Sequence, residues 1–523
     1  MLARAVRDTL TIVRPLVAGL LLSCLACRPA PTPAPTATPD RDARASGAAT
    51  RWSYEIRVDA QLERMQLGLC IEGELPRRLT AAREAIEFVT DARVRDGPEL
   101  ERDDRGLLIS TLGEHGCVDL EIDLERASGQ GRDAGRYGDT LMLAPGRWLW
   151  YPASIPDQLE ARARFELPEG MAATVPWPRI TPDDPADWRA LDRSTFGWNA
   201  WIALGHHEPL HFDAAGCEFE VAVLDGDRKA SDVGIEQWLR LAAETVAQLY
   251  GRFPRDRVAI VVVPSAGWRS TPVLFGMARR GGGGSVMLLL NDSVADDELP
   301  GEWVAVHELL HLGMPLVAEP WMSEGFVTYY THVLRARHGV LDRGGQGPFE
   351  DQREHQIRAA LEILHDGFAG RPTTHTLAAV SENMRAFGNY RRVYWGGAAL
   401  AFDLDVQLRS ASHNRRSLDD LMLAIGPLAP EHRRFAAADL LARMDEEVAR
   451  WHRDGELDHE ISPSEIAALH LRAKATPEHV QRLRGIAVEV RSGRLRLLAN
   501  PNDESEVRSS LFAPKIDFDK AAK

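Results

Sequence analysis

This 523-residue chain has few cysteines, few long apolar runs and no excess of positive charge. It has 5 cysteines and a formal net charge of -15, which excludes a sequence-wide affinity for nucleic acid. The N-terminal apolar stretch, Leu16 to Leu22, is too short to span a bilayer. The composition, 44% hydrophobic and 27% charged, is typical of globular proteins, and the length predicts two or three domains. We therefore expect a multidomain protein without a nucleic-acid partner.

The N-terminus has the pattern of a targeting segment, because three basic residues precede the apolar stretch: Arg4, Arg7 and Arg14. The stretch ends in LLSC, which resembles the bacterial lipobox, so residues 1–23 are predicted to be a signal peptide and Cys24 to carry a lipid. Cys27 is an alternative lipidation site, and an uncleaved anchor or a simple secretory signal is the alternative reading of the whole segment. Residues 24–50 are rich in proline and read as an extended, disordered tether. We expect a lipid-anchored protein of the bacterial cell envelope, in the outer membrane and facing the periplasm or the cell surface.

Three cysteines remain after the N-terminal segment, and an oxidising envelope compartment would allow two of them to pair. Cys70 and Cys117 both lie in strand-like runs of the same region, whereas Cys217 lies farther along the chain. A disulfide between Cys70 and Cys117 is the favoured pairing. The alternative is three buried thiols.

The pattern of apolar residues divides the remaining chain into three parts of an α+β multidomain protein. Residues 51–225 contain short alternating runs such as YEIRVDAQL and CVDLEIDL between turn residues, which predict a β-sandwich-like domain. From about residue 226 to 425, a helix in DVGIEQWLRLAAETVAQLY, strands in DRVAIVVVPS and SVMLLLND, and a series of helices are predicted. Residues 426–523 predict a small α+β region with a helix in FAAADLLARMDEEVARWH and a hairpin in GIAVEVRSGRLRLLAN.

The motif that carries chemistry is HELLH, in which His307 and His311 are four residues apart within a stretch of helical periodicity. Two histidines at this spacing project from one face of a helix, so both imidazoles can reach the same ion. Zinc suits such ligands, and a catalytic zinc site keeps three protein ligands and one open position. Glu308, between the histidines, is the predicted general base. A surface helix that happens to carry two histidines is the alternative explanation.

A third ligand must come from elsewhere, and the next predicted helix, in PWMSEGFVTYY, begins with Glu324 in its first turns. We assign Glu324, with Glu319 as the rival in the intervening loop, because regular elements position ligands more precisely than loops do. The metzincin pattern is excluded, since it requires glycine and histidine where this chain has Met314 and Val317. The sequence therefore predicts one zinc ion per chain, held by two histidines and a glutamate.

Two other groups invite a functional reading. The histidines of GHHEPLHFD resemble a metal cluster, but they lie in the β-rich part near Pro209, so a loop at a domain boundary is the better interpretation: His206, His207 and His211. Trp148, Trp150 and Tyr151 are expected to fill the core.

The strings HELLH and WMSEGFVTYY together resemble the gluzincin zinc metallopeptidases, and the SEGF form looks most like the glycyl aminopeptidase family, a relative of aminopeptidase N. The stretch VYWGGAAL is similar to a third motif of that family. The resemblance implies a thermolysin-like, mostly helical catalytic domain that hydrolyses peptide bonds of peptide or protein substrates with zinc. It also implies that Tyr394, in the third motif, stabilises the oxyanion.

The chain departs from those relatives where they carry an acidic string that binds the free amine of the substrate. Here FGMARRGGGGS has no carboxylate, and Arg279 and Arg280 would instead favour an anionic group of the substrate. The glycine run could equally be a mobile loop beside the cleft. We therefore expect an endopeptidase or a peptidase of relaxed specificity. The alternatives are an aminopeptidase with an unidentified amine anchor and a non-catalytic zinc-containing scaffold, and the sequence leaves the oligomeric state open.

Overall fold

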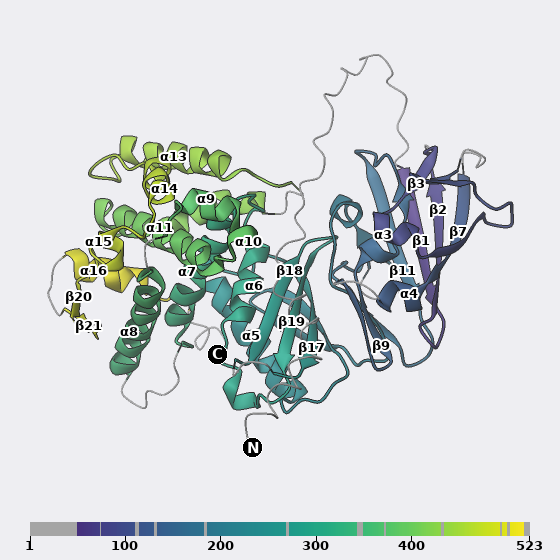
Figure 1. Cartoon of the computed structure of the whole chain (residues 1–523), viewed down its shortest axis with the longest axis horizontal. Helices are drawn as coiled ribbons and strands as arrows, with labels where there is room; N and C mark the ends of the chain where they lie inside the picture. Colours follow the sequence, from purple (N-terminus) through teal and green to yellow (C-terminus); the bar gives the residue numbers. More distant parts are fainter. Residues whose placement is uncertain are drawn as a thin grey trace, which may run out of the picture.

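The computed structural model describes residues 50–73, 75–109, 115–129, 133–181, 186–267, 271–341, 349–370, 373–429, 433–491, 494–498 and 503–516 (Figure 1). The signal peptide, the predicted lipidation sites Cys24 and Cys27, and nearly all of the tether lie outside these residues. Within the described part of the chain, no helix is both long and apolar enough to cross a membrane.

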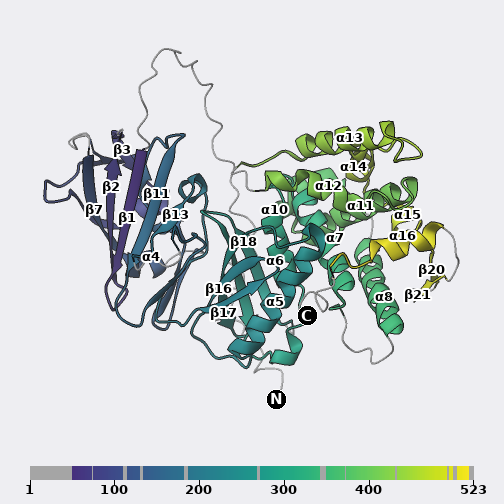
Figure 2. The ribbon, with the colours of Figure 1, turned by 180° about the vertical axis from the view of Figure 1, so that it is seen from behind.

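The β-rich region forms one end of the molecule (Figures 1 and 2). Its largest sheet has the strand order β13-β11-β1-β2-β7-β4, with bounds Arg189–Leu191, Leu159–Glu166, Thr50–Val58, Arg64–Glu72, His115–Asp123 and Val89–Val94. A second sheet has the order β10-β3-β6-β5, with bounds Tyr151–Pro152, Arg78–Thr80, Gly106–Leu108 and Arg102–Asp103. A third has the order β12-β14-β9-β8, with bounds Ala172–Thr174, Ala203–Gly205, Thr140–Leu143 and Ala134–Tyr137. The short helices here are α3, α4, η1 and η2, with bounds Arg83–Ile86, Leu124–Gly129, Pro145–Arg147 and Arg193–Phe196.

One hydrophobic core joins these three sheets. Alternate residues of β1 are buried, as expected for strands with one face in a core and one in solvent. Trp148 and Trp150 are fully buried in this core and Tyr151 packs against it, which confirms that these aromatic side chains fill the interior.

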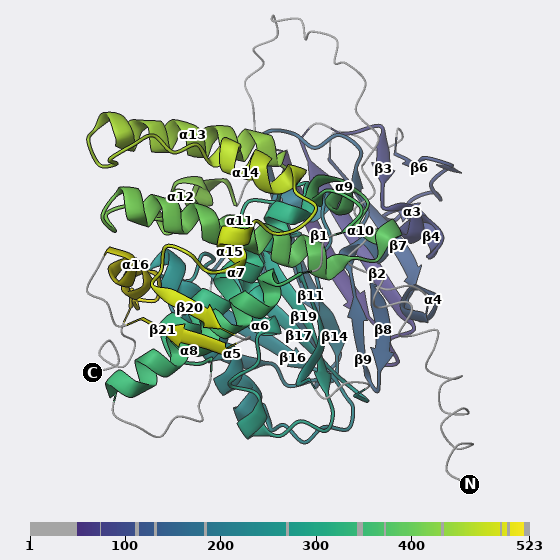
Figure 3. The ribbon, with the colours of Figure 1, turned by 60° about the vertical axis from the view of Figure 1, so that its left-hand side comes forward.

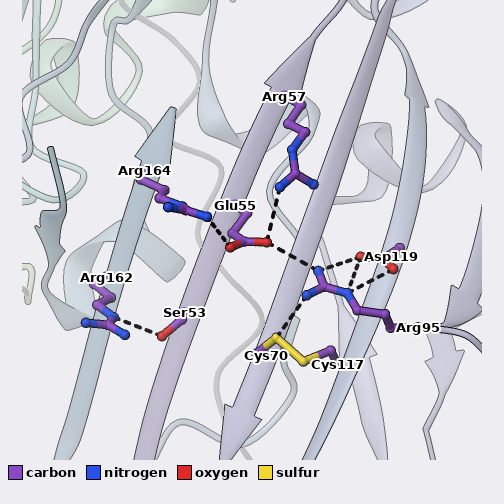
Figure 4. The surroundings of a disulfide bond; sticks show 9 residues. All are labelled: Ser53, Glu55, Arg57, Cys70, Arg95, Cys117, Asp119, Arg162 and Arg164. Carbon is purple, nitrogen blue, oxygen red and sulfur yellow. Dashed lines mark hydrogen bonds and ion pairs between the residues drawn. A yellow bond between two sulfur atoms is a disulfide. The ribbon is translucent and has the colours of Figure 1, made fainter. Parts of the chain in front are cut away.

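A disulfide joins Cys70 and Cys117, which lie directly opposite each other on the antiparallel strands β2 and β7 (Figure 4). This is the pairing that the sequence favours. Arg95 lies beside it: its Nη1 is 3.5 Å from the Cys70 sulfur, and its Nη2 forms an ion pair of 2.7 Å with Asp119. Cys217 is a buried free thiol, and burial raises its pKa.

A five-stranded sheet lies between the β-rich end and the helices (Figure 2). Its order is β15-β16-β17-β19-β18, with bounds Leu210–Ala214, Cys217–Val223, Arg257–Ser265, Gly284–Asn291 and Val273–Arg279. The strands β16, β17 and β19 are parallel, and the two edge strands are antiparallel to their neighbours. The central strand β17 is an apolar run that is buried along almost its whole length, as is typical of a parallel strand covered on both faces.

The helix α5, Asp232–Tyr250, packs on one face of this sheet, and its ends are marked in the sequence. The Ser231 side chain accepts a hydrogen bond from the backbone N–H of Gly234 at the start, and Gly251 ends the helix with a φ of 82°. The opposite face packs against the β-rich region through Met142, Trp201 and Ala203. The boundary predicted between residues 225 and 226 is thus wrong by about one hairpin, because β15 and β16 hydrogen-bond into this sheet.

The helices form the other end of the molecule (Figure 3). The first six after the sheet are α6 to α11, with bounds Val304–Gly313, Pro320–His338, Phe349–Phe368, Leu377–Glu382, Met384–Phe387 and Tyr390–Ala411. They are followed by α12 to α16, with bounds Leu418–Ile425, Ala437–Arg453, Pro463–Arg472, Glu478–Gln481 and Asp503–Leu511. Short 3-10 turns η3 and η4 span Asp296–Glu298 and Gly426–Leu428, and the predicted C-terminal hairpin is formed by β20 and β21, Val488–Arg491 and Arg494–Leu497.

The C-terminal part shares the core of the preceding helices. Leu440, Trp451 and Phe512 belong to the same buried cluster as Phe326 on α7. The predicted boundary between residues 425 and 426 therefore does not separate two cores. The apolar stripe of the amphipathic helix α13 is buried against its neighbours, as a stripe without a core of its own must be.

Helices α7 and α11 approach each other very closely at one pair of glycines. A Cβ atom added to Gly397 would lie 1.8 Å from the carbonyl oxygen of Trp321, and one added to Gly325 would lie 2.4 Å from the Cα of Gly397. Only glycine fits at this crossing. The contact lies next to Glu324 on α7 and three residues after Tyr394 on α11.

Candidate active site

Helices α6 and α7 bring the three predicted ligands together. His307 and His311 lie one turn apart on α6, and Glu324 lies on the second turn of α7, which begins at Pro320. The Nε2 atoms of His307 and His311 are each 3.4 Å from the same carboxylate oxygen of Glu324, Oε2. The His311 and Glu324 side chains are 18% and 21% exposed, so this cluster borders solvent.

The spacing of these atoms fits zinc. Nitrogen and oxygen ligands that each lie about 2.0 to 2.1 Å from a tetrahedral zinc ion are about 3.3 to 3.4 Å from one another. Both measured nitrogen-to-oxygen separations, 3.4 Å, agree with that value. Two imidazoles and a carboxylate are also ligand types that zinc prefers.

The electrostatics of the cluster keep Glu324 ionised. Burial acts to raise the pKa of Glu324, but His311 and His307 outweigh it and hold the pKa well below its usual range. A carboxylate that stays ionised is a competent metal ligand at any ordinary pH.

Thr331, on α7, lies beside the second ring nitrogen of His307. This residue was not identified from the sequence. Its Oγ1 is 3.4 Å from His307 Nδ1, and its hydroxyl donates to the Val327 carbonyl at 2.7 Å. A partner on the second ring nitrogen orients a histidine ligand and fixes its tautomer. The signal available in the sequence is the spacing of seven residues from Glu324, which places both side chains on one face of α7.

Glu308 points from α6 toward the edge strand β18. Its Oε2 accepts a hydrogen bond of 2.9 Å from the backbone N–H of Ala278. The approach requires Gly276, because a Cβ atom there would lie 2.6 Å from Cγ of Glu308. Burial, only partly offset by His307, raises the pKa of Glu308 to about 7. A carboxyl with this pKa can both accept and donate a proton near neutral pH.

Tyr394 reaches the same cluster from α11. Its ring is stacked on that of His307, with the ring centroids 6.0 Å apart and an angle of 6° between the planes. The structure therefore places the predicted metal ligands, Glu308 and Tyr394 around one centre. They come from three helices and a stretch of 88 positions, 307 to 394.

Glu319, the rival third ligand, has a different role. Its Oε2 accepts a hydrogen bond of 2.7 Å from the backbone N–H of Ala437, at the start of α13. It is not part of the His307, His311 and Glu324 group. The structure thus favours Glu324, and Glu319 connects the C-terminal helices to the start of α7.

The positions of Arg279 and Arg280 do not support the predicted binding of an anionic substrate. Arg279 forms an ion pair with Asp133 from the β-rich region, and its guanidinium lies 3.6 Å from the centroid of the Trp201 ring. Arg280 donates a hydrogen bond to the backbone carbonyl of His311. Burial lowers the pKa of Arg279, and it lowers that of Arg280 to about 9. Both guanidinium groups therefore make their contacts within the protein, Arg279 with Asp133 and Trp201 and Arg280 with the His311 carbonyl.

The histidines of the GHHEPLHFD string do not form a metal cluster of their own. His207 is 2.9 Å from the Thr174 hydroxyl, and His206 Nδ1 is 3.1 Å from the Gly170 carbonyl oxygen. His211 instead lies near two carboxylates on β16, Glu218 and Glu220. Both carboxylates already pair with the guanidinium of Arg257, so a cation there would compete with a resident positive charge.

An apolar pocket borders the cluster at His311. Methionines are prominent in its lining, together with side chains of α7 and α12: Met314, Val317, Met322, Phe326, Met422 and Ile425. Methionine side chains are flexible and adapt to irregular apolar shapes. The surface next to His311 is therefore apolar.

Solved structures with similarity to this chain include one that shares its architecture. The chain is similar to an aminopeptidase N family protein from Idiomarina loihiensis, with a TM-score of 0.59 and 14% identity, over 84% of this chain and 79% of that one. It also matches two structures of an M1 zinc metallopeptidase from Deinococcus radiodurans, at 14% and 12% identity. Their TM-scores are 0.46 and 0.48, over 82% of this chain and 96% and 95% of theirs.

At 14% identity the first likeness shows a shared fold. No protein-family model and no curated protein sequence matches the chain. The roles of individual residues therefore rest on the geometry of the site.

Proposed function

We propose that this protein is a zinc-dependent peptidase in which His307, His311 and Glu324 hold the metal. The observation that carries the proposal is the pair of 3.4 Å separations between the histidine nitrogens and one oxygen of Glu324, which match a tetrahedral zinc site. The buried Glu308 and the stacked Tyr394 beside the same cluster favour catalysis over a purely structural metal, because a structural zinc needs neither.

Each side chain has a definite part in this reaction. When bound, zinc supplies a Lewis acid that makes attack of water on a peptide carbonyl feasible at neutral pH. Glu308 accepts the proton of the attacking water and passes it to the leaving amine, for which a pKa of about 7 is well suited. The Tyr394 hydroxyl donates a hydrogen bond to the developing oxyanion. Thr331 holds the His307 ring in place.

The lining of the site favours cleavage that does not depend on a free N-terminus. The stretch from Phe275 to Ser285 has no carboxylate, and Arg279 is neutralised by Asp133. A buried ammonium group needs a paired acid to offset its loss of hydration. An endopeptidase or a peptidase of relaxed specificity is the favoured activity, and an aminopeptidase with its anchor elsewhere in the chain is the second candidate.

The N-terminal sequence supports a lipid anchor at Cys24 in the bacterial cell envelope. Two variants, Cys24→Ser and Cys27→Ser, distinguish the candidate positions. We expect Cys24→Ser alone to abolish lipid labelling and membrane association. Labelling that survives Cys24→Ser and is lost in Cys27→Ser would move the anchor to the second cysteine.

The catalytic proposal is tested by Glu308→Gln with zinc measured on the same sample. The amide oxygen of Gln can still accept the Ala278 N–H, so we expect zinc to be retained and hydrolysis to fall by about a hundredfold or more. Glu302→Gln is the matched control. Glu302 is a second buried carboxyl on the same segment, with its pKa also raised to about 7 by burial, but its Oε2 accepts the backbone N–H of Ala305.

Unchanged turnover in Glu308→Gln would refute the mechanism. Matched peptides with free and acetylated N-termini test the specificity in the same assay. Cleavage that requires the free amine would replace the endopeptidase proposal by the aminopeptidase one. Removal of zinc by a chelator is expected to abolish hydrolysis, and zinc is expected to restore it.

A further inference from the structure

Trp303 is unusual among the tryptophans of the described part of the chain because it is exposed. Trp303 is 42% exposed, whereas Trp201 and Trp321 are at most 4% exposed. A tryptophan side chain carries a large apolar surface, and its exposure to water costs free energy. The position before a helix does not itself require a tryptophan. Single exposed apolar side chains are common, so the position of this ring, and not its exposure alone, carries the argument.

The place of this ring is the edge of the candidate active site. Trp303 immediately precedes α6 and lies one turn before His307. The two rings meet edge to face, with centroids 5.6 Å apart and an angle of 87° between the planes. Tyr394 is stacked on the same imidazole, so His307 lies between two aromatic rings and is only 3% exposed. Trp303 thus combines an exposed surface of 42% with a ring contact to one of the three clustered side chains.

We propose that Trp303 forms an aromatic wall of the substrate site and selects peptides with a large apolar or aromatic side chain beside the scissile bond. This inference rests on the proposed peptidase function and specifies its substrate class. The surroundings agree with it. The pocket at His311 is apolar and rich in methionine, and the nearest cation on β18, Arg279, is neutralised by Asp133. These groups therefore offer no unpaired charge to a charged side chain of the substrate.

The test compares two internally quenched peptides that differ only in phenylalanine or alanine next to the scissile bond, made separately for each flank. Aromatic contacts add about two- to tenfold to affinity beyond simple burial. We expect the wild-type protein to prefer phenylalanine at one flank. Trp303→Ala is expected to reduce that preference about fivefold, mainly through KM, and Trp303→Phe to keep most of it. An equal preference in wild type and Trp303→Ala would overturn the inference.

Leu469→Ala is the control for removing an exposed apolar side chain. Leu469 lies on α14 and is 51% exposed, and we expect its replacement to leave the preference unchanged. A change of the same size in Leu469→Ala would also overturn the inference, because the effect would not be specific to the site.

A binding measurement separates this inference from the proposed chemistry. The dissociation constants of both peptides are measured on zinc-loaded Glu308→Gln protein, with and without Trp303→Ala. A preference for phenylalanine that disappears with Trp303 supports the inference even if the wild-type protein cleaves neither peptide, in which case the peptidase proposal alone fails. Equal affinities with and without Trp303 refute the inference even if wild-type cleavage is fast.

Discussion

Asp419 provides a test of how the helical half of the molecule is held together. This carboxylate at the start of α12 is 1% exposed and forms an ion pair of 2.9 Å with Arg337 on α7. Arg409 on α11 lies 3.6 Å away, and Lys515 near the C-terminus lies 2.9 Å away. One buried anion thus joins the ligand helix, the helix of Tyr394 and the end of the chain.

The replacement Asp419→Asn removes the charge and keeps the shape. Arg409 retains its ion pair with Asp405, at 3.0 Å, whereas Arg337 retains a hydrogen bond to the Leu511 carbonyl, at 2.8 Å, and loses its carboxylate. The main cost is therefore one buried guanidinium without its carboxylate, about 3 to 5 kcal/mol of unfolding free energy. We expect a value near 3 kcal/mol, because Asn still accepts one hydrogen bond. Lys515→Met is the control and is expected to cost less than about 1 kcal/mol, since that side chain is 37% exposed.

Urea unfolding followed by circular dichroism measures these differences at a fixed pH of 7. The double variant Asp419→Asn with Arg337→Met removes both members of the pair and should be less destabilised than the sum of the two single variants. A cost below about 1 kcal/mol for Asp419→Asn, or a double variant that equals the sum, would refute the reasoning.

The same pair sets a dependence on pH. Burial acts to raise the pKa of Asp419, but Arg337, Arg409 and Lys515 outweigh it and hold the pKa below its usual range. A carboxyl whose folded pKa is lowered contributes its full stability above the unfolded value, about 3.9, and loses it as the pH falls further. The stability difference between wild type and Asp419→Asn is therefore expected to shrink below about pH 4.

The remaining predictions concern the site and the disulfide. Tyr394→Phe should keep zinc but lower kcat by about a hundred- to a thousandfold with little change in KM, and a rate within a few-fold of wild type would exclude an oxyanion contact. Thr331→Val should weaken zinc about ten- to a hundredfold in a chelator competition, and an unchanged affinity would show that Thr331 does not support His307. Replacing Cys70 and Cys117 by alanine should cost about 2 to 5 kcal/mol of unfolding free energy, measured by denaturant titration, without changing the hydrolysis rate. A slower reaction at full zinc occupancy would contradict that separation between the β-rich region and the site.

Local patterns were sufficient to predict that His307, His311 and Glu324 lie together. The spacing of His307 and His311 determines which face of a helix they share, and Glu324 follows from the next amphipathic segment. Strands such as β17 and helices such as α5 are equally local, because their apolar periodicity and end signals lie within a few residues. Tyr394 depended on a resemblance, since nothing in its own segment distinguishes a site tyrosine from a core tyrosine.

Contacts between distant segments could not be predicted from these local patterns. The pairing of Arg279 with Asp133 joins residues 146 positions apart, so the sequence shows two arginines near a site but not the acid that neutralises one of them. The placement of β15 and β16 in the five-stranded sheet, and of α13 in the preceding core, depends on tertiary packing in the same way. Thr331 is a different case, because a search for polar residues on the face of Glu324 would have found it.

The crossing of α7 and α11 at Gly325 and Gly397 has a consequence for how the site responds to disturbance. With no side chain between them, the two helices have little room to slide, so the carboxylate of Glu324 and the hydroxyl of Tyr394 are carried on one stiff unit. Thermal motion or a distant mutation is then expected to move this unit relative to α6 as a whole. The distances from Glu324 to His307 and His311 would change first, so metal affinity is expected to be lost before the alignment of Tyr394.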